Sequence, residues 1–260
     1  MERRSLKVFV LFGMIAVGSL CSGQLSSAQT LVQQNVDTRV VLAFRVAHAA
    51  LQRWLPAPWQ VDSIATGPSK DANLTISFIE RMLNQDREGK LIAGGTTRLV
   101  ALVVPAKHGQ TGQAALLDIR EFYASPGEVP GPYKTGIPAI IRREASLQGT
   151  GREPGTGSER WEVQESGGGL IDFRVEYQRS VPTRARPEVK LHSAADPAFF
   201  RIYRPDVGTD VIRSVPASID RVRSYQFRVT VSELRPLFDG TEQLVSLAVL
   251  PWYVREVFLP

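Results

Sequence analysis

The sequence predicts a mainly β protein, a large antiparallel β-barrel with a few short helices. Segments rich in valine, isoleucine, phenylalanine and threonine recur along the chain, and glycine- and proline-rich turns separate them. Stretches with helical periodicity are few and short. With 260 residues, of which 43% are hydrophobic and 22% charged, the chain can bury a sizeable core. The glycine runs are too short for interdomain linkers, so residues 29–260 are expected to form a single domain.

The first 28 residues follow the order of regions found in secretory signal peptides. Met1–Lys7 is basic, Val8–Leu20 is almost wholly apolar, and Ser-Ser-Ala at 26–28 offers small residues to signal peptidase. The apolar run is shorter than the roughly 20 residues that span a bilayer, which favours a cleaved signal over a retained anchor. We therefore expect a mature chain that begins at Gln29, without a membrane span, in the periplasm or secreted.

Composition excludes several classes of site. The net charge of +5 is too mild to indicate a nucleic-acid partner. The single cysteine, Cys21, lies in the predicted signal peptide, so no disulfide within the chain and no thiolate metal cluster can form. The histidines, His48, His108 and His192, lie far apart in the sequence. We expect neither a metal ion nor another cofactor.

The first half of the mature chain is expected to hold one helix and several strands. Ala47–Leu55 consists of good helix formers, with apolar side chains on one face, and Pro56 and Pro58 end the helix. Strands are expected where β-branched and aromatic residues are enriched or alternate with polar ones. These segments are Arg39–Val46, Asn73–Met82, Thr97–Val104 and Ala114–Tyr123.

The second half is expected to consist mostly of strands and turns. The expected strands are Arg142–Gln148, Arg160–Gln164, Leu170–Gln178, Phe199–Tyr203, Val207–Arg213, Ser224–Val231 and Leu244–Phe258. Glycine predicts turns at Gly149–Gly157 and Ser166–Gly169, and Val181–Pro187 is expected to be a basic loop. Ser232–Phe238 is expected to form one or two helical turns.

Two segments, Phe44–Trp59 and Gly131–Pro138, have motifs that resemble those of the acetoacetate decarboxylase-like superfamily. Phe44–Trp59 has a strand, a short helix and a Leu-Pro corner in the order of that family's N-terminal segment. Gly131–Pro138 is similar to its central segment, which ends in Gly-aromatic-Pro, although Ile137 holds the aromatic position here. The resemblance implies a large, mostly antiparallel β-barrel with a buried central cavity for a small organic acid.

The chain departs from this family at the residues that carry its chemistry. In the decarboxylases two lysines follow Gly-aromatic-Pro, and the second forms a Schiff base with the keto acid; here Ala139 and Ile140 follow Pro138. The glutamate that usually precedes the motif is also absent. The resemblance therefore implies a member that does not use the usual Schiff-base lysine. Lys134, the only lysine in the central segment, is the catalytic candidate if the match is shifted.

Arginine exceeds lysine by 25 to 6, and several arginines fall within expected strands. A guanidinium group can hold a carboxylate through two parallel hydrogen bonds. Arg120 and Glu121 are adjacent on a strand, so one of them points into the barrel, and Glu121 is the second catalytic candidate. The candidate ligand-binding residues are Arg120, Arg142, Arg143 and Tyr133. Alternatively, the strand arginines lie outside and pair with acidic neighbours.

Two functions from different classes follow from these observations. The first is an exported enzyme, lyase-like but with altered chemistry, that transforms a small keto or carboxylic acid. The second is a non-catalytic periplasmic barrel that binds a small, partly apolar ligand. Aromatic residues at the ends of expected elements would then line the cavity; they are Trp54, Trp59, Phe122, Tyr123, Trp252 and Tyr253. The sequence decides neither between these functions nor between a monomer and an oligomer.

Overall fold

The computed structural model describes residues 29–260, and the predicted signal peptide lies outside the described residues. The strands of the first half are β1 (Thr30–Arg45), β2 (Trp59–Val61), β3 (Leu74–Gln85), β4 (Thr97–His108) and β5 (Ala114–Tyr123). The strands of the second half are β6 (Gly136–Gln148), β7 (Thr156–Glu165), β8 (Leu170–Gln178), β9 (Thr183–Ala185), β10 (Val189–Ser193), β11 (Phe200–Ser214), β12 (Ile219–Asp220), β13 (Val222–Val229) and β14 (Gln243–Leu259). The helices are α1 (His48–Gln52) and two 3-10 turns, η1 (Pro126–Glu128) and η2 (Ser232–Leu234). No helix within residues 29–260 has both the length and the apolar character of a membrane span.

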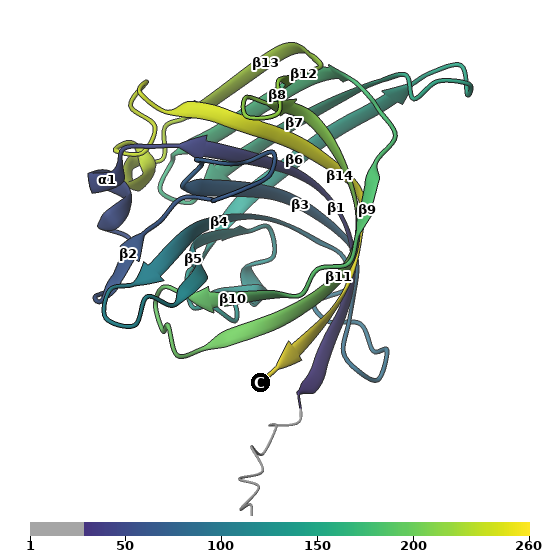
Figure 1. The fold of residues 1–260 in the computed structure, drawn as a ribbon. Coiled ribbons are helices and arrows are strands. Elements are labelled where there is room, and N and C mark those ends of the chain that lie inside the picture. Colours follow the sequence, from purple (N-terminus) through teal and green to yellow (C-terminus); the bar gives the residue numbers. More distant parts are fainter. Residues whose placement is uncertain (1–28) are drawn as a thin grey trace, which may run out of the picture.

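Seven strands close into a barrel in the order β5, β10, β11, β14, β1, β3 and β4 (Figure 1). The pairing of β4 with β5 closes the ring, from Leu99 opposite Tyr123 to Lys107 opposite Ala114. All neighbours in the ring are antiparallel except β10 and β5, which run parallel. The prediction of a mainly β, largely antiparallel barrel with few short helices is therefore confirmed.

A second sheet, formed by β6, β7, β8 and β13, covers one side of the barrel (Figure 1). It begins where Gly136–Pro138 pairs in parallel with Glu121–Tyr123 at the end of β5. Aromatic rings fill the space between the two layers. The ring centroid of Phe78 on β3 lies 5.1 Å from that of Phe173 and 5.5 Å from that of Trp161. All three side chains are fully buried, so the main core lies between the barrel wall and the second sheet.

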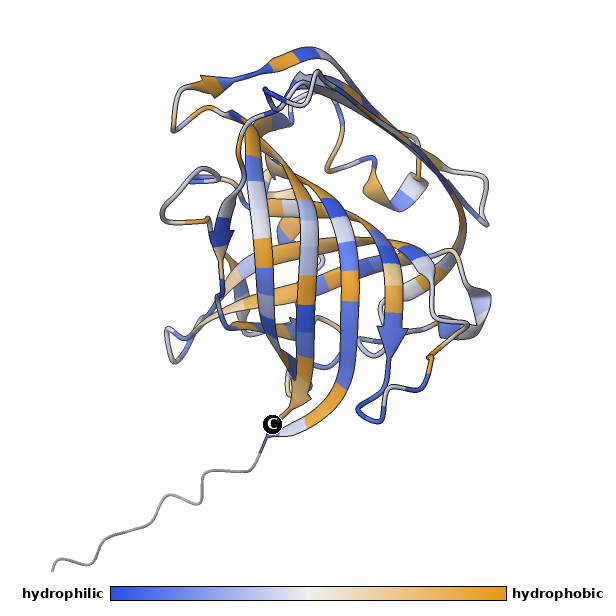
Figure 2. Cartoon of the chain, turned by 90° about the vertical axis from the view of Figure 1, so that its right-hand side faces the viewer, coloured by the Kyte–Doolittle hydropathy of each residue, from blue (hydrophilic) through white to orange (hydrophobic). Residues whose placement is uncertain are grey.

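The strands of the barrel wall are covered on both faces. On β4, Val100, Leu102 and Val104 belong to the core under the second sheet, whereas Leu99 and Ala101 point into the barrel. This double burial explains why β4 is almost continuously apolar. Figure 2 shows polar and apolar residues interleaved along the barrel strands that face the viewer there. Gln33, Arg81 and Glu121 are among the residues that line the barrel interior, so the interior is partly polar, unlike the main core.

Two elements of the first half differ in extent from those expected. The strand expected at Arg39–Val46 begins nine residues earlier, at Thr30, as β1. Its first half is polar because side chains such as Gln33 face the barrel interior, and this hides the strand pattern. The helix expected at Ala47–Leu55 contains α1, and tight turns continue from α1 to Leu55.

Two elements of the second half also differ. The expected strands Phe199–Tyr203 and Val207–Arg213 form one strand, β11, which passes through Pro205. Pro205 lies between the part of β11 that pairs with β10 and the part that pairs with β9, so its missing N–H breaks neither ladder. The loop expected at Val181–Pro187 contains the short strand β9.

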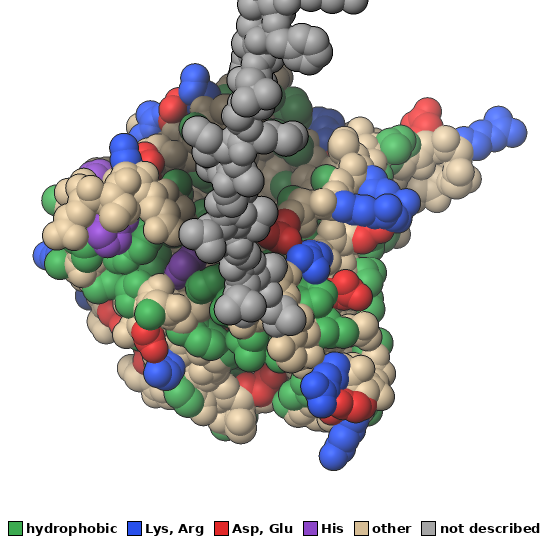
Figure 3. Space-filling model, turned by 60° about the horizontal axis from the view of Figure 1, so that its bottom comes forward, with side chains coloured by type: hydrophobic (Ala, Val, Ile, Leu, Met, Phe, Trp, Pro, Cys, Tyr) green, Lys and Arg blue, Asp and Glu red, His purple; other side chains and the backbone are tan. Residues whose placement is uncertain are grey.

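Charges of both signs are interspersed on the outer surface. Figure 3 shows basic and acidic side chains next to one another around hydrophobic patches on one face. On the outer face of the second sheet, Arg142 Nη1 lies 2.7 Å from Glu162 Oε1, and Arg174 Nη2 lies 3.0 Å from Asp172 Oδ2. For Arg142 and Arg174, the structure therefore agrees with the alternative expectation that strand arginines lie on the outside and pair with acidic neighbours.

Candidate ligand-binding site inside the barrel

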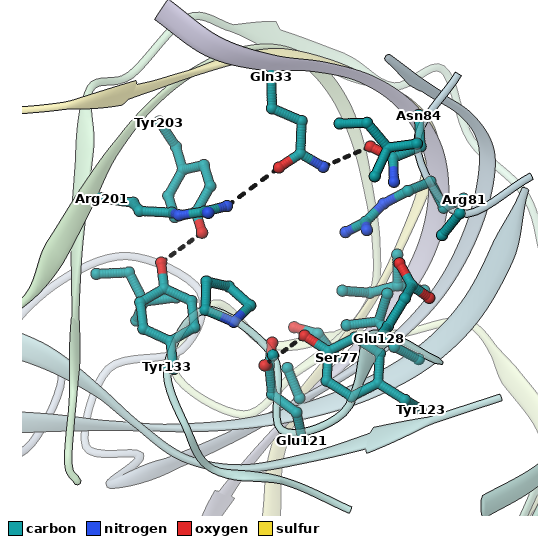
Figure 4. A pocket seen from close by; sticks show the side chains of 18 of the residues that line it. Gln33, Ser77, Arg81, Asn84, Glu121, Tyr123, Glu128, Tyr133, Arg201 and Tyr203 are labelled. Atoms are coloured by element: carbon teal, nitrogen blue, oxygen red, sulfur yellow. Dashed lines mark hydrogen bonds between the residues drawn. The ribbon is translucent and has the colours of Figure 1, made fainter. Parts of the chain in front are cut away.

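A cavity of about 690 Å³ lies inside the barrel (Figure 4). Residues of β1, β3, β4, β5, β11 and β14 form most of its wall, and the segment 127–133, Leu191 on β10 and the loop residues Ile92 and Ala93 form the rest. Its volume falls within the range of roughly 300–1,000 Å³ that small-molecule sites occupy. The barrel therefore has room for an organic ligand.

Four arginines from neighbouring strands line this cavity. They are Arg201 on β11, Arg255 on β14, Arg39 on β1 and Arg81 on β3. Asp37 lies beside two of them: its Oδ2 accepts a hydrogen bond of 2.5 Å from Arg39 Nη2, and its Oδ1 lies 3.5 Å from Arg81 Nε. Burial raises the pKa of Asp37, but Arg39, Arg255 and Arg81 outweigh burial and hold the pKa below its ordinary value. Asp37 is therefore a carboxylate that compensates one of the four positive charges.

The guanidinium group of Arg81 differs from those of its neighbours. Arg201 Nη1 donates to Gln33 Oε1 over 3.1 Å, and Arg255 Nε donates to Asn35 Oδ1 over 2.9 Å. Within residues 29–260, the Arg81 guanidinium has no hydrogen-bond partner, and its one ion pair is with Asp37 Oδ1, 3.5 Å from Nε, although the residue is only 7% exposed. Figure 4 shows its guanidinium directed toward the open centre of the cavity. Because Asp37 also pairs with Arg39, the buried Arg81 guanidinium keeps N–H groups without an acceptor, which is unfavourable, and an anion in the cavity would provide that acceptor.

Glu121 and Tyr123, both on β5, lie across the cavity from Gln33 (Figure 4). The Tyr123 hydroxyl donates a hydrogen bond of 2.6 Å to Glu121 Oε2. Gly131 closes this corner: its φ is +72°, and a Cβ there would lie 2.7 Å from the Tyr123 hydroxyl oxygen and 3.1 Å from Glu121 Oε2. Burial raises the pKa of Glu121 above its ordinary value, and the hydrogen bond from Tyr123 and the cavity arginines offset part of this rise. Glu121 is thus a carboxyl group able to exchange a proton with a ligand.

A second carboxyl group, Asp118, lies on the same strand and is fully buried. Thr135 Oγ1 donates to Asp118 Oδ1, whereas Oδ2 is buried without a hydrogen-bond partner among the described residues. Burial and the negative charge of Glu121 raise the pKa of Asp118 well above its ordinary value. Asp118 therefore keeps its proton while Glu121 is charged.

The remaining wall combines two tyrosines with aliphatic side chains. The hydroxyl groups of Tyr133 and Tyr203 are hydrogen-bonded to each other, and the guanidinium carbon of Arg255 lies 4.5 Å from the ring centroid of Tyr203. Burial raises the pKa of Tyr133 well above its ordinary value, so its hydroxyl stays protonated. The aliphatic residues are Ile79, Leu99, Ala101 and Val103. The cavity therefore offers cationic, hydrogen-bonding and apolar surfaces to one ligand.

Two of the residues predicted from the sequence, Glu121 and Tyr133, line the cavity. Arg120 does not line it. Its Nη1 donates to the carbonyl oxygen of Thr135 over 2.9 Å, and its Nη2 donates to Glu233 Oε2 over 2.6 Å. Glu121 is therefore the member of the adjacent pair that faces the cavity, and Arg120 links β5 to Thr135 and to Glu233 on η2.

Lys134, the first catalytic candidate, does not line the cavity. Its side chain is 65% exposed, and its Nζ lies 3.5 Å from Asp196 Oδ2. The residue before it, Tyr133, points into the cavity, and Lys134 follows with a φ of +59° that turns its side chain to solvent. None of the five lysines in residues 29–260 lines the cavity.

Arg142 and Arg143, two of the ligand-binding candidates, lie on the second sheet and do not line the cavity. Only the first residues of β6, Gly136–Pro138, pair with the barrel, and the rest of β6 belongs to the second sheet. The Arg142 side chain is 66% exposed, and Arg143 Nη2 lies 2.7 Å from Glu159 Oε1. Ile140, the position matched to the family's lysine, is 57% exposed on the same sheet.

Sequence reasoning missed Arg39, Arg81 and Arg255. All three lie in expected strands, so the excess of arginine in strands pointed toward such residues. The sequence did not show whether each arginine side chain faces the barrel interior or its outside. Among the aromatic residues proposed for the lining, Tyr123 lines the cavity. The others named were Trp54, Trp59, Phe122, Trp252 and Tyr253, and none of these contributes to it.

The described residues bring no metal ligands together. Within residues 29–260, no group of three or more histidine, cysteine, aspartate or glutamate side chains could hold a metal ion. The rings of His108 and Trp59 pack edge to face with centroids 5.1 Å apart. His192 Nδ1 lies 2.9 Å from the carbonyl oxygen of Pro197. These histidines have local packing and hydrogen-bonding roles.

No protein-family model matches the chain, and no curated protein matches its sequence. Solved structures do match its fold. The acetoacetate decarboxylase-like enzyme from Sphingomonas wittichii RW1 has a TM-score of 0.57 and 12% identity, over 92% of this chain and 94% of its own. The chain has the acetoacetate decarboxylase-like fold.

Two further structures share the decarboxylase-like fold. The enduracididine biosynthesis enzyme MppR complexed with pyruvate has a TM-score of 0.56 and 12% identity, over 92% of each chain. Acetoacetate decarboxylase from Legionella pneumophila has a TM-score of 0.51 and 11% identity, over 98% of this chain and 96% of its own. The predicted resemblance is confirmed at the level of the fold, and identity this low carries no activity across.

Proposed function

We propose that this decarboxylase-like barrel is an exported protein that binds a small organic acid, such as a keto acid, in its central cavity. The observation that carries the proposal is the buried guanidinium group of Arg81, which faces the cavity without a hydrogen bond among the described residues. A ligand carboxylate would supply the missing partners through two parallel, charge-assisted hydrogen bonds. The pyruvate complex of MppR supports a ligand of this class.

The balance of charge in the cavity also favours an anion. Four guanidinium groups line the cavity, whereas Asp37, Glu121 and Glu128 can together compensate three of them at most. Because burial raises the pKa of Glu121, this residue compensates less than a full charge as the pH falls. A bound carboxylate would restore neutrality inside the barrel.

The size and the apolar part of the cavity favour a ligand larger than pyruvate. A volume of about 690 Å³ exceeds what a three-carbon acid fills. Ile79, Leu99 and Ala101 form an apolar surface beside the polar groups, which suits an aliphatic or aromatic extension. A keto acid with a longer side chain would occupy both surfaces at once.

We further propose that the ligand is not held as a Schiff base. That chemistry requires a lysine amine beside the ligand carbonyl. The cavity lining within residues 29–260 contains no lysine, and the side chain of Lys134 is mostly exposed. Any catalysis would therefore rely on the carboxyl, tyrosine and arginine groups of the wall.

Isothermal titration calorimetry of residues 29–260 with keto acids of increasing chain length tests this function. We expect binding that weakens by about 10- to 100-fold in Arg81→Gln, because a charge-assisted hydrogen bond contributes about 1.5–3 kcal/mol. Arg174→Gln, which removes an arginine from the outer face of the second sheet, is the matched control and should bind like the wild type. Equal binding of the corresponding neutral amides, or unchanged binding in Arg81→Gln, would contradict the proposal.

A non-catalytic binding barrel is the second candidate, and the lysine-free cavity lining favours it. The two candidates share a ligand and differ in what happens to it. Incubation of the wild type with a bound keto acid, followed by nuclear magnetic resonance, separates them. A binding protein returns the ligand unchanged, whereas an enzyme alters it.

A further inference from the structure

We propose that Glu121 is the general base of a lysine-free enolisation, in which it removes a proton from the carbon beside the ketone of a bound keto acid. The inference rests on the proposed function, because the arginines must first hold the carboxylate of the substrate. It assigns a reaction class to the cavity: reversible proton abstraction next to a carbonyl, without an amine, a metal or a cofactor as participant.

The position of the Glu121 carboxyl group is the first argument. The side chain lines the cavity, and the residue is only 5% exposed. Tyr123 holds Oε2 through a hydrogen bond of 2.6 Å, while Oε1 has no hydrogen-bond partner among the described residues. One oxygen is thus fixed by the protein and the other is free to receive a proton from a ligand within hydrogen-bond reach.

The backbone around Glu121 keeps this geometry fixed. Glu121 lies in β5, a strand paired on one side with β4 and on the other with Gly136 of β6. Gly131 packs against both oxygen atoms of the Tyr123–Glu121 pair closely enough to leave no space for a side chain. A base held by packing loses little freedom when it meets its substrate, which favours proton transfer.

The charges around Glu121 make the base respond to the substrate. The positive charges of Arg81, Arg255 and Arg201 lower the pKa of Glu121 and so favour its ionised form, against the effect of burial. A bound carboxylate would offset these positive charges, and Glu121 would then attract a proton more strongly. The neighbouring Asp118 stays protonated, so it adds no second charge that would compete for the same proton.

Another acidic side chain of the lining, Glu128, is less suited to this role. It lies on η1, outside the barrel strands, and its Oε2 is buried without a hydrogen-bond partner among the described residues. Among residues 29–260, a tyrosine hydroxyl donates to the carboxyl group of Glu121 and none donates to that of Glu128. Glu121 is therefore the group that the structure prepares for proton transfer.

The reaction balances with the groups present. The C–H bond beside the ketone breaks, its proton moves to Glu121 Oε1, and its electron pair forms a C=C bond. The carbonyl π electrons move onto the oxygen, which becomes an enolate, and N–H or O–H donors of the arginines and tyrosines stabilise this charge. Return of a proton from Glu121 to carbon regenerates the keto acid, so the step consumes no oxidant, reductant or co-reactant.

Deuterium exchange tests the proposal. Pyruvate, 2-oxobutanoate and 2-oxopentanoate are incubated with residues 29–260 in D₂O. Proton nuclear magnetic resonance then follows the loss of signal from the protons on the carbon beside the ketone, as deuterium replaces them. The wild type should accelerate exchange over buffer, and Glu121→Gln should slow the accelerated rate by at least about 100-fold, the scale of a lost general base. Glu121→Asp, which withdraws the carboxyl group by one methylene, should lose most of the rate as well.

Controls distinguish a failure of the enolisation proposal from a failure of the proposed ligand binding. Glu144→Gln, at a 74% exposed side chain on the second sheet, should exchange at the wild-type rate. Calorimetry on the same samples should show that Glu121→Gln and Glu121→Asp still bind the keto acid. Binding without accelerated exchange in the wild type, or wild-type exchange in both Glu121 variants, would overturn the enolisation alone. Absence of binding to the wild type would overturn the proposed function and, with it, this inference.

Discussion

The hydroxyl of Tyr123 donates to Glu121 Oε2 over 2.6 Å, at a corner of the cavity that Gly131 closes. Two residues of one strand, spaced two apart, thus place a carboxyl group and its hydrogen-bond donor on the same face of β5. The arginines approach the cavity from other strands, β1, β3, β11 and β14. The site therefore depends on closure of the barrel, which brings these strands around one space.

Gly131→Ala is expected to disrupt this corner. The substitution adds a Cβ at a φ of +72° that would lie 2.7 Å from the Tyr123 hydroxyl oxygen. Strain and clash together should lower the free energy of unfolding by about 1–3 kcal/mol in urea denaturation. Gly151→Ala is the matched control, because Gly151 has a φ of +84° with nothing within 4 Å of an added Cβ. Equal losses in the two variants would mean that the contact with Tyr123 contributes nothing.

Asp118→Asn is expected to change how stability depends on pH. The pKa of Asp118 is raised in the folded state by burial and by Glu121, so the folded state binds this proton more tightly than the unfolded state. Its stabilising contribution is complete below the unfolded pKa of about 4 and falls as pH rises toward the folded value. Asp118→Asn removes this loss, so its stability relative to the wild type should increase from pH 5 to pH 8. Urea denaturation at pH 5 and pH 8 measures this difference in stability, and a difference that stays constant between the two would show that Asp118 does not titrate in this way.

Borohydride trapping addresses the absence of Schiff-base chemistry. Incubation of residues 29–260 with pyruvate and sodium borohydride should give no reduced adduct in the cavity, since no lysine of these residues lines it. Intact mass spectrometry followed by peptide mapping reads the result. An adduct that maps to Lys134 and disappears in Lys134→Ala would show that the loop rearranges and would restore the amine mechanism.

Export is tested at the amino terminus. The basic, apolar and small-residue regions of residues 1–28 predict cleavage after Ala28. Amino-terminal sequencing of protein recovered from the cell envelope should begin at Gln29 or within a few residues of it. Recovery of the uncleaved chain from the membrane fraction would favour a retained anchor instead.

Much of the fold was predictable because strand alternation is a local property. The bounds expected for Ala114–Tyr123 and Leu170–Gln178 match β5 and β8. The first half of β1 escaped prediction because its interior face is polar, as at Gln33, and such a strand resembles a loop in sequence. Two strands were expected on either side of Pro205, whereas the structure has the single strand β11. Pro205 is tolerated because it lies between the residues of β11 that pair with β10 and those that pair with β9.

The site was only partly predictable because it depends on register and closure. Alternation shows that Arg120 and Glu121 face opposite sides, but not which side is the cavity. Both faces of the barrel wall are buried, so hydrophobicity could not assign Arg81 to the interior. Arg142 was assigned wrongly because β6 leaves the barrel after Pro138, and nothing in its sequence marks that departure.

A crystal structure of residues 29–260 with a bound keto acid would show whether Arg81 holds the ligand carboxylate inside the barrel. We expect density for the ligand there, with a carboxylate oxygen within about 3.2 Å of a guanidinium nitrogen of Arg81, the reach of an N–H···O hydrogen bond. The carbon beside the ketone should then face Glu121. Density continuous with a lysine Nζ, or a ligand that binds outside the barrel while the cavity stays free of it, would contradict the account.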